Sequence, residues 1–317
     1  MKKFLGVFAL ILLVFTVLVW PEEKNFSVET AIARLTASSA RYPISFVIFS
    51  DNHCFSGDEI FAELRDDGLA KKPDFFIHLG DLTDNGAEPE YDGLKKLLRD
   101  IEVPFFPVVG NHDLYADDAP RRYQKMFGKW NYYFDYGPAR FIFLRTAYQL
   151  ENKFPGSDNH QVEYYLSDSQ IEHLEKLLAG AKMKFIFMHV PPQIDHYPPT
   201  TPLNFLDNAD RFMNLLKKYQ VTAVFMGHRH IFDRYHYGST EMIIVPSSGG
   251  PGFGKVLATE PDGGAFFGYL FAQITSATSI RIRVISCRRF ARGYELGEDQ
   301  ITINDFANFT ISTDAKN

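Results

Sequence analysis

The 317-residue chain carries 33 Lys and Arg against 39 Asp and Glu, and its formal net charge of −6 argues against binding of long nucleic acid through the phosphates. Only two cysteines occur, Cys54 and Cys287, which excludes a disulfide framework and a zinc–thiolate site, although the two could pair in an exported protein. The length is sufficient for one large or two small domains with a substantial core.

The N-terminus has two positive charges, Lys2 and Lys3, followed by an uncharged apolar stretch from Phe4 to Trp20. About 20 apolar residues span a bilayer, so residues 1–20 are predicted as a retained membrane anchor, with the rest of the chain on the extracytoplasmic side. The alternative is a cleaved signal peptide and a secreted protein, but the apolar run does not end in the small residues of a cleavage site. A cytosolic protein with an apolar N-terminal helix is a third possibility.

Residues 21–42 are predicted as a polar tether with room for a short helix, residues 43–290 as the functional domain, and residues 291–317 as a C-terminal tail. From residue 43 onward, short apolar runs rich in β-branched and aromatic residues alternate with helical patterns. One helical pattern starts with a capping box, Ser167-x-x-Gln170. The β-α-β order predicts an α/β domain with parallel strands.

The last third of the chain changes character. Strand-like segments at 241–245, 265–274 and 279–286 follow one another with turns and no helices between them. They predict a second, more antiparallel sheet that packs on the first.

Residues of metal-binding types follow five of the apolar runs. They are Asp51-Asn52-His53, Gly80-Asp81-Leu82-Thr83-Asp84, Gly110-Asn111-His112-Asp113, His189 and Gly227-His228-Arg229-His230. In open α/β sheets, ligands bind beyond the carboxyl ends of the strands, so these residues are expected to converge on one crevice. Carboxylate, amide and imidazole ligands without thiolates suit Mn, Fe, Zn or Co. The set is large enough for two divalent ions, and a close pair of ions needs a shared carboxylate.

Taken together and in this order, the five motifs resemble the signature of the calcineurin-like metallophosphoesterase superfamily over roughly residues 44–230. The resemblance implies an α/β fold of two packed mixed β-sheets flanked by helices, in four α/β/β/α layers. It also implies a dinuclear site with two sets of ligands. One metal would be held by Asp51, His53, Asp81 and His230, and the other by Asp81, Asn111, His189 and His228.

A dinuclear site of this kind is expected to hydrolyse phosphoester bonds. A hydroxide that bridges the two metals would attack phosphorus in line with the leaving oxygen. His112 lies beside Asn111 without being a ligand, and is the candidate to protonate the leaving group or to hold the developing charge. Asp84 is expected to orient His112 through the other ring nitrogen, as outer carboxylates do around metal sites.

Differences from the sequence patterns of known subfamilies narrow the range of expected substrates. Asn85 follows Asp84 where protein Ser/Thr phosphatases have Arg, and Asp113 ends the third motif where they have Glu. Asp84 also occupies the position of the tyrosine ligand of purple acid phosphatases. What remains is the branch of phosphodiesterases and general phosphoesterases, with a phosphodiester or a nucleotide- or lipid-linked phosphate as the favoured substrate. The alternatives are a phosphomonoesterase and, with less support, a nuclease or a non-catalytic scaffold.

Three segments, at 148–166, 191–206 and 246–264, are expected as loops that surround the site and face the substrate. Residues 249–255 fit the spacing G-x-x-x-x-G-K of a phosphate-binding loop. Val256 stands where such a loop needs Ser or Thr, so we interpret this run as part of the rim of the metal site instead.

Overall fold

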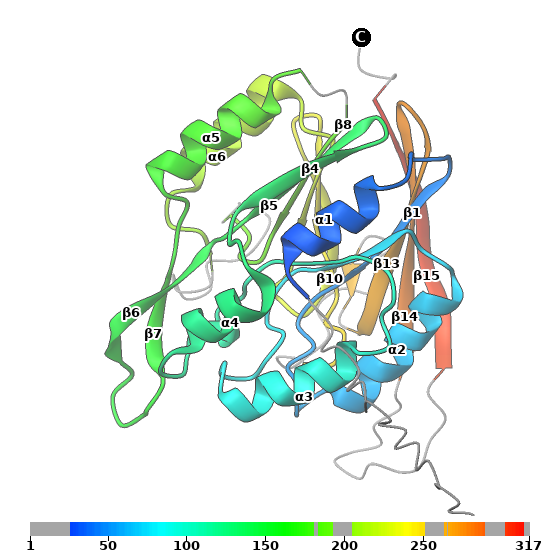
Figure 1. The fold of residues 1–317 in the computed structure, drawn as a ribbon. Helices are drawn as coiled ribbons and strands as arrows, with labels where there is room; N and C mark the ends of the chain where they lie inside the picture. The colour runs from blue at the N-terminus through cyan, green and yellow to red at the C-terminus, as the bar shows by residue number, and fades with distance from the viewer. Residues whose placement is uncertain are drawn as a thin grey trace, which may run out of the picture.

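The computed structural model describes residues 26–180, 183–192, 205–250, 263–264, 266–288 and 302–313. The predicted anchor and most of the predicted loops at 191–206 and 246–264 lie outside these residues. Two large mixed sheets pack face to face, and helices cover their outer faces (Figure 1). The predicted fold of two packed mixed sheets flanked by helices is confirmed.

The first sheet has six strands in the order β15-β14-β13-β1-β2-β3. They are β1 (Ile44–Phe49), β2 (Phe75–His78), β3 (Phe105–Pro107), β13 (Phe267–Ser276), β14 (Ser279–Arg288) and β15 (Thr302–Ser312). β1, β2 and β3 run parallel to one another, and β13, β14 and β15 join them as antiparallel strands. Three of the five motifs follow the parallel strands of this sheet.

The second sheet has seven strands in the order β12-β10-β11-β9-β8-β5-β4. They are β4 (Tyr132–Tyr136), β5 (Ala139–Leu144), β8 (Met183–Met188), β9 (Ala223–Met226), β10 (Phe232–Tyr237), β11 (Thr240–Ile244) and β12 (Gly263–Gly264). β5, β8, β9 and β11 are parallel, and the two remaining motifs follow β8 and β9.

The strands of the last third do not form a sheet of their own, so that prediction is wrong. β11 lies parallel to β9 in the second sheet, whereas β13 and β14 extend the first sheet from β1. Local sequence identifies a strand, but the partner depends on which sheet edge the chain reaches. Part of the predicted tail is also a strand, because β15 pairs with β14 and places Phe306 and Phe309 against the core between the sheets.

Side chains of β1 alternate between two cores. Phe46 and Ile48 belong to the core between the sheets, whereas Val47 and Phe49 belong to the core under the helices. The Phe46 ring stacks on Phe75 at 5.0 Å between ring centroids and meets Phe141 of the second sheet edge-on at 5.5 Å. These contacts hold the two sheets together directly beneath the first motif.

The helices complete the outer layers. Over the first sheet lie α2 (Asp58–Ala70), α3 (Glu88–Leu98) and α4 (Ala119–Phe127), and over the second lie α5 (Asp168–Leu178) and α6 (Ala209–Tyr219). The predicted capping box of α5 is confirmed, because the Ser167 hydroxyl accepts from the Gln170 amide and the Gln170 side chain accepts from the Ser167 amide. Among the helices of the described residues, none has the length and apolarity to cross a bilayer.

Helix α1 (Val28–Thr36) lies within residues 21–42, where the prediction left room for a short helix, but it does not belong to a free tether. Val28 and Leu35 are buried in the core between the sheets, so this part of the predicted tether is packed on the domain. The segment at 148–166 is not a loop either, because it contains an antiparallel hairpin, β6 (Ala147–Lys153) and β7 (His160–Tyr164). Figure 1 shows this hairpin projecting beside α4.

Candidate metal centre

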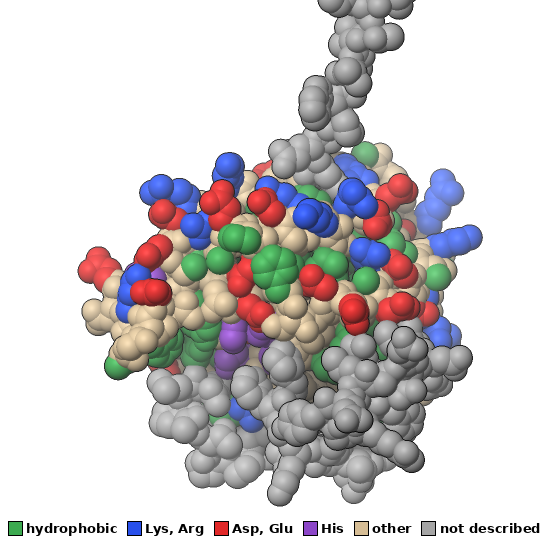
Figure 2. Space-filling view, turned by 90° about the horizontal axis from the view of Figure 1, so that it is seen from below, with side chains coloured by type: hydrophobic (Ala, Val, Ile, Leu, Met, Phe, Trp, Pro, Cys, Tyr) green, Lys and Arg blue, Asp and Glu red, His purple; other side chains and the backbone are tan. Residues whose placement is uncertain are grey.

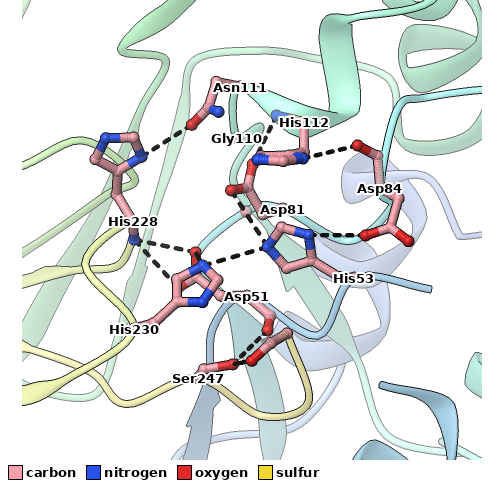
Figure 3. Close-up of polar contacts among 12 residues, drawn as sticks. Asp51, His53, Asp81, Asp84, Gly110, Asn111, His112, His228, His230 and Ser247 are labelled. Atoms are coloured by element: carbon pink, nitrogen blue, oxygen red, sulfur yellow. Dashed lines mark hydrogen bonds and ion pairs between the residues drawn. The ribbon is translucent and has the colours of Figure 1, made fainter. Parts of the chain in front are cut away.

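The motifs of both sheets meet at one place. The loops after β1, β2 and β3 approach those after β8 and β9, since the carboxyl ends of these strands lie at the same edge of the packed sheets. Figure 3 shows six of the seven predicted ligands around a common centre. All seven are brought together, as Asp51, His53, Asp81, Asn111, His189, His228 and His230.

A first group of four side chains presents ligand atoms that all lie within 4.8 Å of one another: Asp51, His53, Asp81 and His230. Nε2 of His230 is 3.3 Å from Oδ1 of Asp51 and 3.3 Å from Nε2 of His53. Nε2 of His53 is 3.6 Å from Oδ2 of Asp81. Two carboxylates and two imidazole nitrogens directed at one point make a suitable set for a divalent ion.

The second group shares Asp81 with the first and adds His189 and His228. Nε2 of His189 is 3.2 Å from Oδ2 of Asp81, and Nδ1 of His228 is 3.3 Å from Nε2 of His189. The side-chain oxygen of Asn111 joins them, at 3.1 Å from His189 and 2.9 Å from His228. Nδ1 of His189 lies 2.7 Å from the Leu79 carbonyl, which leaves Nε2 as the ligating nitrogen.

The backbone at this site is strained. Nine non-glycine residues of the described ranges have positive φ, and five of them are predicted ligands: Asp51, His53, Asp81, His228 and His230. Their φ angles lie between 50° and 71°, in the left-handed region that costs about 1–2 kcal/mol for an ordinary residue. Such strain persists where the surrounding structure imposes it, and it concentrates at functional sites.

Close backbone packing supports the strained loops. A Cβ atom on Gly110 would lie 2.1 Å from Oδ1 of Asp81, and one on Gly250 would lie 2.3 Å from the His53 ring. The Gly250 amide and the Ser247 hydroxyl both donate to the Asp51 carbonyl at 2.8 Å, and Figure 3 includes Ser247 beneath Asp51. Residues 247–250 therefore lie at the metal centre itself.

The electrostatics of the cluster fit bound cations. Burial alone would raise the pKa of Asp51, but the charge of His230 and its hydrogen bond hold that pKa below the usual range. Burial would likewise raise the pKa of Asp81, and the charge of His189 lowers it well below normal. Both carboxylates are thus ionised although they are buried, with exposed fractions of 0% and 1%. Buried charges of this kind need compensation, which divalent ions supply.

Two histidines of the second group, His189 and His228, have pKa values shifted in opposite directions. Burial would lower the pKa of His189, but the neighbouring Asp81 charge raises it to about 9. Burial, together with the charge of His189, lowers the pKa of His228 to about 3. In the absence of metal, one proton thus remains next to Asp81 while His228 is neutral.

Asp84 does not have the partner that the sequence analysis assigned to it. Its carboxylate lies 3.0 Å from Nδ1 of His53 and accepts from the Ser56 hydroxyl, whereas only its backbone carbonyl reaches His112. The prediction that the Asp84 carboxylate orients His112 is therefore wrong. It orients His53 instead, because Ser56 and His53 both draw it toward the loop after β1.

His112 is held by three neighbours. Its amide donates to Oδ1 of Asp81 at 2.8 Å, and its Nδ1 donates to the Asp84 carbonyl at 2.7 Å. Its ring lies 4.4 Å from that of His53 between centroids. Since Nδ1 donates to a carbonyl, Nε2 is the nitrogen at which a proton can be exchanged with a substrate.

Two residues shape the third motif: Tyr115, which the sequence analysis did not name, and Asp113, to which it gave no structural role. The side-chain amide of Asn111 donates to the Tyr115 hydroxyl at 2.7 Å, which turns the Asn111 oxygen toward the histidines. Buried Asp113 accepts from the Thr83 amide and hydroxyl, each at 3.0 Å, and from the Gly110 amide at 2.9 Å. Asp113 thereby joins the second and third motifs, and burial raises its pKa to about 7. The adjacency of Tyr115 to the motif was the signal that could have found it.

Cys54 and Cys287 are both buried free thiols, so the two are not paired in this structure.

Comparison with known proteins identifies the family. Residues 44–232 match the calcineurin-like phosphoesterase family. The "Probable glycerophosphodiester phosphodiesterase GpdQ" of Arcobacter nitrofigilis is 30% identical over 212 residues, which cover 64% of this chain and 72% of that protein. A "Probable cyclic nucleotide phosphodiesterase" of Rhodopseudomonas palustris is 28% identical over 211 residues, which cover 59% of this chain and 72% of that protein.

Solved structures share the fold. A dimetal phosphatase from Danio rerio has a TM-score of 0.59 at 14% identity, over 85% of this chain and 99% of that chain. The purple acid phosphatase PPD1 of yellow lupin has the same TM-score at 17% identity, over 87% of this chain and 54% of that chain.

Fold and site together define a metal-dependent phosphoester hydrolase that uses two divalent metal ions. The chain belongs to the calcineurin-like phosphoesterase family.

Proposed function

We propose that this enzyme is a phosphodiesterase in which two ions share Asp81. The first ion would bind Asp51, His53, Asp81 and His230, and the second would bind Asp81, Asn111, His189 and His228. The observation that carries this assignment is the membership of Asp81 in both ligand groups. A carboxylate with two oxygens can contact two ions at once.

When bound, the two ions lower the pKa of water and stabilise charge on the phosphoryl oxygens. The protein contributes geometry. Asp84 holds the His53 ring, the Leu79 carbonyl holds the His189 ring, and Tyr115 holds the Asn111 amide. Ligands fixed in this way do not have to reorganise during the reaction.

His112 would act on the leaving group. As the P–O bond breaks, its electron pair passes to the leaving oxygen, which then takes a proton from Nε2 of His112. Burial lowers the pKa of His112, and the Asp84 carbonyl opposes this shift because it accepts from Nδ1 at 2.7 Å and so favours the protonated ring. General acid catalysis by a positioned histidine contributes about 10²–10⁴ in rate.

Charge balance favours a diester over a monoester. Two divalent ions bring four positive charges and a protonated His112 brings a fifth, whereas the ionised carboxylates Asp51, Asp81 and Asp84 bring three negative charges and the hydroxide nucleophile a fourth. The remaining single positive charge is complementary to a monoanionic diester, whereas a monoester carries up to two negative charges. The names of the relatives above, which are phosphodiesterases, point in the same direction.

A comparison of bis-p-nitrophenyl phosphate with p-nitrophenyl phosphate tests this proposal. The enzyme would be stripped with EDTA and reconstituted with Mn²⁺, Zn²⁺ or Fe²⁺ in parallel. We expect a higher kcat/KM on the diester, with activity lost on chelation and restored by metal. Faster hydrolysis of the monoester would refute the diester preference, and activity that survives prolonged chelation would refute the metal mechanism.

We also propose that residues 1–20 anchor the protein in a membrane, with the catalytic domain on the extracytoplasmic side. The support is the sequence pattern alone, Lys2 and Lys3 before an apolar run that ends at Trp20. Protease treatment of intact cells, followed by fractionation, would test this. Domain fragments released by the protease support the proposal, whereas a protected domain in the soluble fraction contradicts it.

A further inference from the structure

The β6–β7 hairpin is hydrogen-bonded to the segment that carries the third motif. The Gln149 side chain donates to the carbonyls of Leu114 and Ala116, at 2.6 and 2.9 Å. The His160 amide donates to the Tyr115 carbonyl at 2.7 Å. These hydrogen bonds fix the hairpin relative to Asn111 and His112. All three acceptors are backbone carbonyls of residues 114–116, so the side chains of those residues do not matter for the bonds.

The turn of the hairpin contacts the second motif as well. The Asn159 side chain donates to the Asn85 side chain at 2.8 Å, directly after Asp84. Within the turn, the Phe154 amide donates to the Asn159 carbonyl at 2.9 Å, and the Ser157 amide donates to the Phe154 carbonyl at 3.1 Å. The position of Phe154 is thus set by a closed turn that is attached to the site.

These contacts produce a row of rings that leads out of the metal centre. The Tyr115 ring lies 4.7 Å from the His112 ring, and the Phe154 ring meets Tyr115 edge-on at 6.1 Å between centroids. Tyr164 of β7 meets the His228 ring edge-on at 5.4 Å between centroids. The row runs from the catalytic histidine to the tip of the hairpin.

The outer end of this row is open to solvent. Phe154 is 41% exposed, one of four large apolar side chains with this degree of exposure among the described residues. Figure 2 shows histidine side chains at a hollow in the surface with hydrophobic side chains beside them. Ligand sites are lined mainly by apolar and aromatic side chains, and Phe154 continues such a lining outward from Tyr115.

We propose that Tyr115 and Phe154 form a subsite for the leaving group, and that this leaving group carries a planar ring, as a nucleoside does. This inference depends on the proposed function, because His112 can protonate only a leaving oxygen beside it. The remainder of the leaving group then extends along Tyr115 toward Phe154. Aromatic side chains stack on nucleobases and other flat rings, whereas a glycerol group has no ring face to offer.

The test uses the full-length, Mn²⁺-loaded enzyme and two diesters. Thymidylyl-thymidine has a nucleoside leaving group, and glycerophosphoethanolamine has none. Phe154→Ala is expected to lower kcat/KM about ten-fold on the dinucleotide and to change it less than about two-fold on glycerophosphoethanolamine. Phe154→Tyr keeps the ring and is expected to retain most of the activity on the dinucleotide. Tyr133→Ala, which removes another exposed aromatic side chain from edge strand β4, is the control and is expected to have no effect.

Three results would overturn the subsite. They are an equal loss on both diesters, no loss on the dinucleotide, and wild-type activity on glycerophosphoethanolamine alone. Failure of the wild type on every diester would instead refute the proposed function. Thermal unfolding of each variant separates a loss of fold from a loss of recognition, and the Phe154→Tyr variant provides the same comparison if Phe154→Ala is unstable.

Discussion

Replacing Tyr115 with Phe removes one hydroxyl, the acceptor for the Asn111 amide at 2.7 Å. The ring remains, so its contact with His112 at 4.7 Å is preserved. Without the hydroxyl the Asn111 amide can rotate, and its oxygen no longer points at His189 and His228. Loss of an outer partner of a metal ligand costs about 10–100-fold in metal affinity. We expect about ten-fold, or about 1.4 kcal/mol, since one neutral hydrogen bond is lost.

Calorimetric titration of the metal-free enzyme with Mn²⁺ measures this effect. A two-site fit is expected to show weaker binding at the second site and an unchanged first site, because Asn111 belongs only to the second group. Tyr132→Phe is the matched control, since it removes a hydroxyl that donates to the Pro107 carbonyl at 2.8 Å without touching a ligand. Equal weakening at both sites, or a similar effect in Tyr132→Phe, would refute the role of Tyr115.

Three further variants probe other parts of the site. His112→Ala is expected to keep both metals, measured by elemental analysis, and to lower kcat by about 10²–10⁴-fold. Asp84→Asn removes the charge beside Nδ1 of His53, so affinity at the first site is expected to fall about 10–100-fold in Mn²⁺ titrations. Gly110→Ala places a methyl group 2.1 Å from Oδ1 of Asp81. The free energy of unfolding, measured with denaturant, is expected to fall by about 1–3 kcal/mol.

A different result would contradict each of these three expectations. Wild-type activity in His112→Ala would remove His112 from the mechanism. Unchanged metal affinity in Asp84→Asn would mean that the carboxylate is not needed to hold His53. A fully stable, metal-loaded Gly110→Ala enzyme would show that the loop can move away from Asp81.

The convergence of the candidate ligands could be predicted from sequence because each of them follows a short, strongly apolar strand. Such strands are recognisable locally, and their carboxyl ends must lie near one another when the strands are parallel. The left-handed backbone at Asp51, His53 and Asp81 gave no signal in advance. Residues other than glycine rarely adopt that conformation, and here it is imposed by contacts between loops distant in the sequence.

The direction in which a side chain points, and the group to which it hydrogen-bonds, could not be predicted from the sequence. The Asp84 carboxylate faces His53 because Ser56 lies on the same side, which no spacing indicates. The hairpin at 147–164 escaped prediction because β6 has a largely polar, exposed outer half and depends on hydrogen bonds to residues about 35 positions earlier. β15 was missed because it is an edge strand. Its pairing with β14 is a tertiary contact that the local sequence does not reveal.

The sharing of Asp81 between two ions is the central claim, and counting metal ions per chain tests it most directly. Elemental analysis of the reconstituted wild-type enzyme should find two divalent ions per chain, and Asp81→Asn should retain at most one. An Asp81→Asn enzyme that still binds two ions with wild-type affinity would contradict the claim, as would a fully active wild type that binds only one.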